Sequence, residues 1–294
     1  METSVYFLKA YETRTLLNRA MIQAMLLYIR IIMTVMLIFF SILYSLLAYN
    51  SFYRNWFVEW MTAKANTAGM KPDIEGERVY VPRRNKRDVR VNLYRCPHGK
   101  HVVYLCHGGD FLNGDPDDLD AFCMKVRDLW QANIVSIGYS LVDVHVTTYP
   151  QEEITDTILY FREHAEEYGF GNKAVLLGFD AGAYLAAISA VQLVQKGCIL
   201  NGHIYCYPYV DYVQTSFAKA GYHVGPVALV AAGEEKQLAT MEEYEKTLSD
   251  AGIPCRMKVY PDEKRNFIED GKGRSEEALS WLKERIGEFT GQFA

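Results

Sequence analysis

Short apolar segments alternate with amphipathic stretches through most of the chain after residue 77. Three β-rich segments come first, at 78–81, 89–94 and 101–106, and their close spacing predicts an antiparallel entry. The later β-rich segments are 134–139, 174–179, 203–207, 227–231 and 256–260, and helical stretches lie near 119–130, 152–168, 181–195, 241–250 and 275–289. Strands separated by helices need crossover connections, which place them in a mostly parallel sheet. The sequence therefore predicts an α/β fold with about eight strands flanked by helices.

A second constraint is an apolar run near the N-terminus. Residues 31–53 contain no charged side chain, and about 20 apolar residues are enough for a helix to cross a bilayer. We expect a single transmembrane helix here, with Tyr49 and Tyr53 at one membrane interface. A buried core helix fits less well because the run is apolar on every face. A cleaved signal peptide also fits less well, because about thirty residues precede the run.

The chain thus divides into an amphipathic N-terminal helix (1–30), the transmembrane helix (31–53), a connector (54–76) and an α/β domain (77–294). The N-terminal helix can lie on the membrane, contacting lipid, or pack against a partner helix. Charges on the two sides of the apolar run are nearly balanced. A basic cluster fits either an anionic cytoplasmic leaflet or, more simply, a solvated hairpin turn. Its members are Arg83, Arg84, Lys86, Arg87 and Arg90. We expect the domain on the cytoplasmic side.

Composition argues against several classes of ligand, nucleic acid and metal ions among them. A formal net charge of -5 gives no electrostatic reason to bind nucleic acid. The six cysteines lack CxxC spacing, so neither a zinc module nor a disulfide framework is predicted. An acidic run at 115–120 can be imagined as a cation site. Asp115 followed by Pro116 is more typical of a helix N-cap, with the later carboxylates favoured by the helix dipole. We expect no metal and no cofactor.

The candidate site residues lie in two glycine-containing turns. Segment 101–106 runs into His107-Gly108-Gly109, and segment 174–179 runs into Asp180-Ala181-Gly182. A sharp strand-to-helix turn needs glycine on both sides of its central residue, and Gly178 and Gly182 meet that need around Asp180. The amides of Gly108, Gly109 and Ala181 are candidate donors to a developing oxyanion.

This order of motifs resembles the hormone-sensitive-lipase-like esterases of the α/β-hydrolase superfamily, over about residues 77–289. The resemblance implies a glycine loop that binds the oxyanion, a serine nucleophile in a GxSxG turn, and a late Asp and His. This chain departs from that pattern at all three reactive positions: it has Asp180 for the serine, Lys236 for the acid and Arg265 for the histidine.

None of these substitutes can perform the inherited task. Asp180 supplies no hydroxyl, Lys236 cannot orient a histidine, and the guanidinium of Arg265 stays protonated near neutrality. The sequence therefore predicts a catalytically inactive membrane protein, a binding or scaffold subunit of a membrane-associated complex. It also predicts a salt bridge between Asp180 and Arg265, because a buried unpaired carboxylate is costly.

Two alternatives stay open. Asp180 can act as the nucleophile, as in haloalkane dehalogenases and epoxide hydrolases, although no histidine follows His223 to activate water. The old substrate pocket can instead hold a small-molecule ligand, as in the plant gibberellin receptor, which would need an apolar cavity of roughly 300 Å³.

Other polar residues receive simpler interpretations. His107 is expected to hold the glycine loop, and His145 is a weak candidate for a displaced base. Tyrosines near the end of segment 203–207 can line a cleft, but packing is the favoured interpretation. They are Tyr205, Tyr207, Tyr209 and Tyr212.

Overall fold

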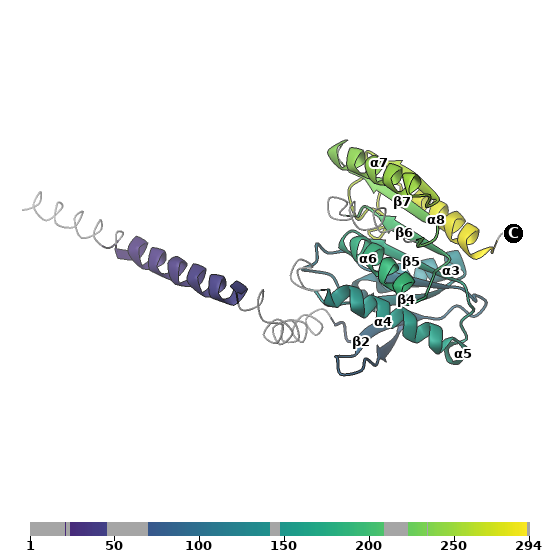
Figure 1. Ribbon diagram of the computed structural model, residues 1–294, viewed down its shortest axis with the longest axis horizontal. Coiled ribbons are helices and arrows are strands. Elements are labelled where there is room, and N and C mark those ends of the chain that lie inside the picture. Colours follow the sequence, from purple (N-terminus) through teal and green to yellow (C-terminus); the bar gives the residue numbers. More distant parts are fainter. Residues whose placement is uncertain are drawn as a thin grey trace, which may run out of the picture. The chain divides into compact units, whose positions relative to one another are not determined.

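The computed structural model describes residues 21, 24–45, 70–141, 148–208, 223–233 and 235–292. Chain contacts divide it into two compact units, Met1–Phe57 and Val58–Ala294 (Figure 1). His145, Tyr209, Tyr212, most of the predicted N-terminal helix and most of the predicted connector lie outside the described residues.

The first unit contains an apolar helix, Ala24–Ser45, whose 22 residues have a mean hydropathy of 2.4. It includes Ala24–Arg30, which come before the predicted start at Ile31, because Arg30 is the only charged residue in this otherwise apolar stretch. The hydroxyl of Thr34 donates to the carbonyl of Arg30 at 2.8 Å, one turn earlier. Length and composition make this helix a candidate membrane span. Residues 46–53 of the predicted span lie outside the described part.

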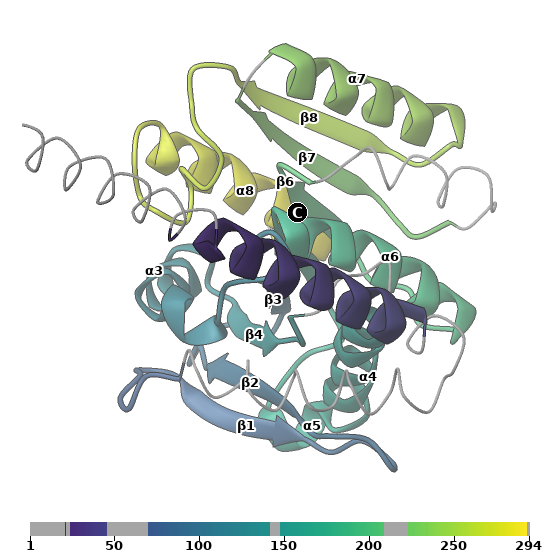
Figure 2. The same cartoon turned by 90° about the vertical axis from the view of Figure 1, so that its left-hand side faces the viewer.

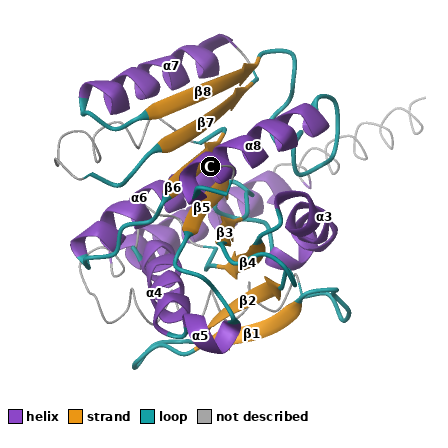
Figure 3. Ribbon diagram, turned by 90° about the vertical axis from the view of Figure 1, so that its right-hand side faces the viewer, coloured by secondary structure: helices purple, strands orange, loops and turns teal. Residues whose placement is uncertain are grey.

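The second unit is built on a sheet of eight strands in the order β1-β2-β4-β3-β5-β6-β7-β8 (Figure 3). The strands are β1 (Glu77–Val81), β2 (Val89–Tyr94), β3 (Val102–Cys106), β4 (Asn133–Gly138), β5 (Ala174–Phe179), β6 (Gly202–Cys206), β7 (Val227–Ala232) and β8 (Cys255–Tyr260). β1 pairs with β2, and β2 with β4, in antiparallel fashion. All other neighbours are parallel. The α/β fold class predicted from the sequence is confirmed.

Helices cover both faces of this sheet (Figure 2). They are η1 (Pro116–Leu119), α3 (Asp120–Trp130), α4 (Tyr149–Glu163), α5 (Ala165–Tyr168), α6 (Ala181–Gln195), α7 (Glu235–Asp250) and α8 (Ser275–Thr290). α4, α6 and α7 contribute to one apolar core, and α3 and α8 to the other. Side chains alternate between the cores along a strand: Tyr104 joins the first, while Val103 and Leu105 join the second. Both faces are thus buried, and the carboxyl ends of the parallel strands gather at one edge.

Two residues of the basic cluster, Arg83 and Arg90, are buried, so the cluster is not a fully solvated turn. The side chain of Arg83 is only 2% exposed and pairs with Asp156 at 2.8 Å and with Glu153 at 3.7 Å, both on α4. Arg90 is also buried and pairs with Asp115. A buried guanidinium needs a carboxylate partner, so these two arginines stabilise the fold and do not face solvent or lipid.

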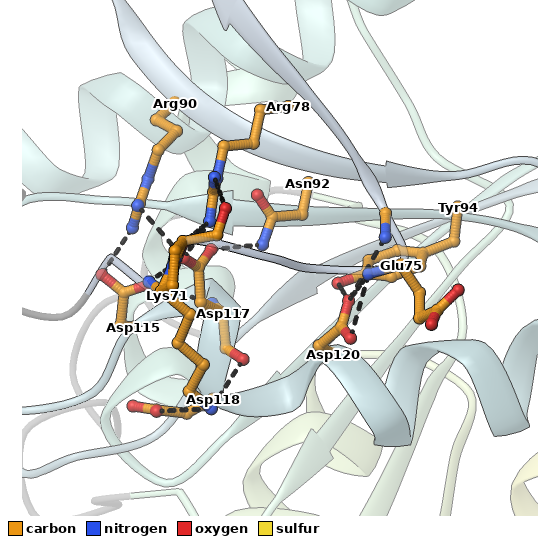
Figure 4. A network of polar contacts seen from close by, with 12 residues as sticks. Lys71, Glu75, Arg78, Arg90, Asn92, Tyr94, Asp115, Asp117, Asp118 and Asp120 are labelled. Carbon is orange, nitrogen blue, oxygen red and sulfur yellow. Dashed lines mark hydrogen bonds and ion pairs between the residues drawn. The ribbon is translucent and has the colours of Figure 1, made fainter.

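The acidic run ties the edge of the sheet to α3 (Figure 4). Asp115 caps η1 as predicted, accepting from the amide of Asp117 at 2.9 Å. Asp117 is fully buried and accepts from Asn92 at 2.8 Å and from Arg78 at 2.7 Å. Asp120 accepts from the hydroxyl of Tyr94 at 2.9 Å. These carboxylates therefore hold β1 and β2 against η1 and α3.

Removing the central carboxylate of this network is expected to destabilise the fold. We predict that Asp117→Ala lowers the free energy of unfolding by about 3 kcal/mol, because it leaves buried donors unpaired. The matched variant Asp118→Ala, whose side chain is 58% exposed, should cost less than about 1 kcal/mol. Urea unfolding of the full chain in detergent measures both. Equal losses would show that the network does not depend on Asp117.

The same carboxylate sets a pH dependence. Burial opposes ionisation of Asp117, but hydrogen bonds from Asn92, Lys71 and Arg78 outweigh it and lower the pKa below the ordinary 3.8. Its stabilisation is therefore fully present above pH 3.8 and is lost as the pH falls through the lowered pKa. Unfolding measured between about pH 5 and pH 2 should show this loss in the parent chain and not in Asp117→Ala.

Candidate active site

The turn between β5 and α6 holds Asp180 in a strained backbone conformation, with φ 52° and ψ -118°. Its neighbours have no room for side chains. A Cβ on Gly178 would lie 2.5 Å from the Cα of Ala183, and one on Gly182 would lie 2.2 Å from the carbonyl of His107. The glycines at these positions therefore allow the sharp turn, which presents the Asp180 carboxylate at the carboxyl edge of the sheet.

The loop after β3 points two backbone amides at this carboxylate. The amides of Gly109 and Asp110 donate to Oδ2 of Asp180 at 3.2 and 3.1 Å. Gly109 and Asp110 have φ values of 126° and 53°, and such left-handed backbone commonly forms concave anion-binding nests. Of the residues proposed as oxyanion donors, Gly109 makes this contact. Gly108 packs beside the Cβ of Asp180, and the role of Ala181 stays a prediction.

Arg265 reaches the same carboxylate from the loop between β8 and α8. Its guanidinium donates to Oδ1 of Asp180 and, at 3.1 Å, to the carbonyl of Tyr207. The predicted salt bridge is confirmed, and its side chains are 28% and 5% exposed for Arg265 and Asp180. Burial of Phe267 and Ile268 in the second core fixes this loop. Lys236 belongs to α7, and its side chain lies outside the described part.

A second carboxylate, Glu269, lies in the same loop and was missed in the sequence. The hydroxyl of Tyr207 donates to Oε2 of Glu269 at 2.6 Å. Burial and the nearby charges of Asp270 and Asp180 raise the pKa of Glu269 to about 7, although the Tyr207 hydrogen bond lowers it. Tyr207 is therefore more than a packing residue, because it connects Glu269 to the strand edge.

His107 plays the structural part expected of it. Its ring stacks on Tyr139 at 4.3 Å between centroids, and its Nδ1 lies 2.8 Å from the carbonyl of Gly108. The hydroxyl of Tyr139 donates to the carbonyl of His107 at 2.6 Å. Burial lowers the pKa of His107, which keeps the ring neutral and in place beneath the glycine loop.

Two cavities among the described residues lie away from this site. One of about 280 Å³ includes Lys100 and Lys173 in its lining, and one of about 220 Å³ includes Val102 and Ala174. These residues precede or begin β3 and β5, whereas Asp180 follows the end of β5. The receptor alternative gains no support from these cavities.

Several known proteins with similar sequence or fold are named esterases. Residues 102–223 match the family described as alpha/beta hydrolase fold. An acetyl esterase of Salmonella schwarzengrund is 34% identical over 123 residues, which cover 40% of this chain and 36% of that protein. The chain thus matches about a third of the length of this relative. The resemblance inferred from the sequence is confirmed.

Solved structures agree on the fold. A hyperthermophilic esterase from Pyrobaculum calidifontis is 19% identical with a TM-score of 0.64, covering 80% of this chain and 90% of that one. Carboxyl esterase 2 from Tuber melanosporum is 12% identical with a TM-score of 0.66, covering 76% and 89%. The chain therefore has the α/β-hydrolase fold.

These comparisons overturn the prediction of an inactive scaffold. The similar proteins are named acetyl esterase, esterase and carboxyl esterase, which supports an active hydrolase. The overturned prediction rested on the changes at the three reactive positions, Asp180, Lys236 and Arg265.

The Asp180–Arg265 pair should be energetically coupled. We predict that Arg265→Met lowers the free energy of unfolding by about 2 kcal/mol, because it leaves a buried carboxylate without its cation. In the Asp180→Asn background the same change should cost much less, giving a coupling of about 1–3 kcal/mol in a double-mutant cycle. Lys264→Met, at an exposed neighbouring position, is the control and should change little. Additive effects of the two changes would contradict the coupling.

Proposed function

We propose that this protein, a chain with the α/β-hydrolase fold, is a membrane-anchored hydrolase of small acyl esters that uses Asp180 as its nucleophile. One observation carries the proposal: Oδ2 of the elbow carboxylate accepts from two backbone amides, as an oxyanion does in acyl transfer. The names of the similar proteins, acetyl esterase among them, support this substrate class.

In the first step Oδ1 of Asp180 attacks the acyl carbon of the ester. The bond from that carbon to the alcohol oxygen breaks, giving an acyl–Asp180 anhydride and an alkoxide or phenolate. Arg265, which contacts Oδ1, stabilises the departing anion by charge and cannot protonate it. The site therefore favours esters whose alcohol leaves readily as an anion.

In the second step water attacks Cγ of Asp180. The carbonyl oxygen Oδ2 becomes the oxyanion and is stabilised by the amides of Gly109 and Asp110. Collapse of this intermediate releases the carboxylic acid and regenerates Asp180, which now carries an oxygen atom from water. The sum is ester plus water giving acid plus alcohol.

Membrane attachment is assigned to the Ala24–Ser45 helix. Its apolar side chains, including Leu37, Phe39 and Phe40, are exposed within the described residues. An exposed apolar surface of this length is stable in lipid and unfavourable in water. The sequence expectations of a cytoplasmic domain and of partner subunits in the membrane stay predictions.

The nucleophile is tested by isotope labelling. The full chain in detergent, given limiting p-nitrophenyl acetate in ¹⁸O-water, should incorporate label into the peptide containing Asp180. Asp180→Asn should lose at least about 100-fold in turnover, because the amide cannot attack. Turnover with neither label in Asp180 nor an acetyl group trapped on its peptide would contradict the nucleophile, because water that attacks the acyl carbon of the anhydride returns Asp180 unlabelled.

The anchor is tested in membranes. Cells expressing the full chain should retain it in the pellet after alkaline carbonate extraction. Changing both Phe39 and Phe40 to Lys should shift it toward the soluble fraction, because each charge near the helix centre costs about 3 kcal/mol in insertion. The conservative change of both residues to Leu is the control. A mature chain that lacks residues 24–45 would instead identify a cleaved signal sequence.

A further inference from the structure

The hydrolytic step of the proposed reaction needs a group that takes a proton from water. The inherited histidine position holds Arg265, which cannot accept a proton. We infer that Glu269 is the general base of this site and activates the water that hydrolyses the acyl–Asp180 intermediate. This inference rests on the proposed function and names a residue that the sequence pattern of the superfamily does not identify.

Glu269 lies in the loop between β8 and α8, four residues after Arg265, so both residues come from the loop that carries the histidine in the resembling esterases. The guanidinium of Arg265 donates to the carbonyl of Tyr207 at 3.1 Å, and the hydroxyl of Tyr207 donates to Glu269 at 2.6 Å. Tyr207 and Arg265 thus link Glu269 to the Asp180 carboxylate.

The loop is held on both sides of Glu269, because Phe267 and Ile268 before it are buried and the amide of Asp270 after it donates to the carbonyl of Asn266 at 3.0 Å. Tyr207 is itself fixed, since its ring packs on Phe179 with centroids 6.2 Å apart. A base must be held within reach of its water, and these contacts hold the Glu269 carboxylate in one place.

The titratable groups around Glu269 are Asp180 from the elbow, Tyr207 and Cys206 from β6 and the residue after it, and Asp270 from its own loop. Burial and the two aspartates disfavour its anion, and together they bring its pKa to about 7. A carboxylate with this pKa is a much stronger base than an ordinary one and is half ionised near neutrality. Burial raises the pKa of the Tyr207 hydroxyl far above its usual value, so Tyr207 stays protonated and donates.

Both protons of the attacking water can be accounted for. The ionised Glu269 removes one proton as the water oxygen bonds to Cγ of Asp180, and it later passes that proton to the released alkoxide or to solvent. The second proton of the water stays on the new oxygen of Asp180 until the intermediate collapses, and it then passes to the released carboxylate, which leaves as the acid. The first step needs no proton transfer when the alcohol leaves as an anion. Loss of Glu269 should therefore slow deacylation and spare acylation.

The test compares the parent chain with Glu269→Gln, using full-length protein in detergent and p-nitrophenyl acetate. For the parent chain, kcat should rise with pH through an apparent pKa near 7, because Glu269 works only when ionised. Glu269→Gln should lower steady-state turnover by about 100-fold or more and abolish this rise. It should still release a burst of p-nitrophenol, and mass spectrometry should find the acetyl group on the Asp180 peptide.

Two further variants separate a base from a structural residue. Tyr207→Phe removes a hydrogen bond that favours the anion of Glu269, so the rise should move to higher pH. Asp262→Asn, at an exposed position of the same loop, should leave the profile unchanged. A merely structural role for Glu269 would lower burst and turnover together without changing the pH profile.

The outcomes also separate the two proposals. Parent chain that incorporates ¹⁸O into Asp180, together with a Glu269→Gln variant that keeps both the pH profile and the turnover, would overturn the role of Glu269 alone. Parent chain that turns over with neither label nor a trapped acetyl group on the Asp180 peptide would overturn the nucleophile and, with it, the base proposed here. A retained burst with trapped acetyl–Asp180 in Glu269→Gln supports both.

Discussion

The carboxylate of Asp180 is almost fully buried at the turn between β5 and α6, where an unpaired charge would be strongly destabilising. Two backbone amides and the guanidinium of Arg265 satisfy it. The rest of the site is arranged around this charge. The glycine loop supplies the amides, and the β8–α8 loop brings Arg265 to one oxygen and Glu269 into electrostatic range of the carboxylate.

The parallel sheet brings the loops of the site together. Its parallel strands end at a common edge, and two apolar cores hold helices against both faces, so loops distant in sequence meet there. At the antiparallel end, the buried carboxylates of Asp117 in η1 and of its N-cap residue Asp115 pair with arginines of β1 and β2. The acidic run is thus part of the scaffold, and its charges are satisfied by the protein itself.

Sequence reasoning located the elbow because the glycines around Asp180 have a steric cause that can be recognised from spacing alone. It paired Asp180 with Arg265 because two opposite charges at adjoining positions make electrostatic sense. It missed Asp110, because the contact with Asp180 is made by a backbone amide, and residue identity does not signal such a contact. It missed Glu269, because a glutamate in a loop has no distinctive pattern until burial changes its pKa.

The amino-acid sequence by itself determined the α/β alternation, the apolar N-terminal helix and the identity of the residue at the sharp turn. These are local properties, set by hydrophobic periodicity, length and the steric demands of glycine. Only the tertiary structure decided which oxygen of Asp180 meets the amides, that Arg83 and Arg90 are buried, and that Glu269 stands near the elbow. Such features depend on contacts between segments far apart in the chain and on burial, which local sequence patterns do not encode.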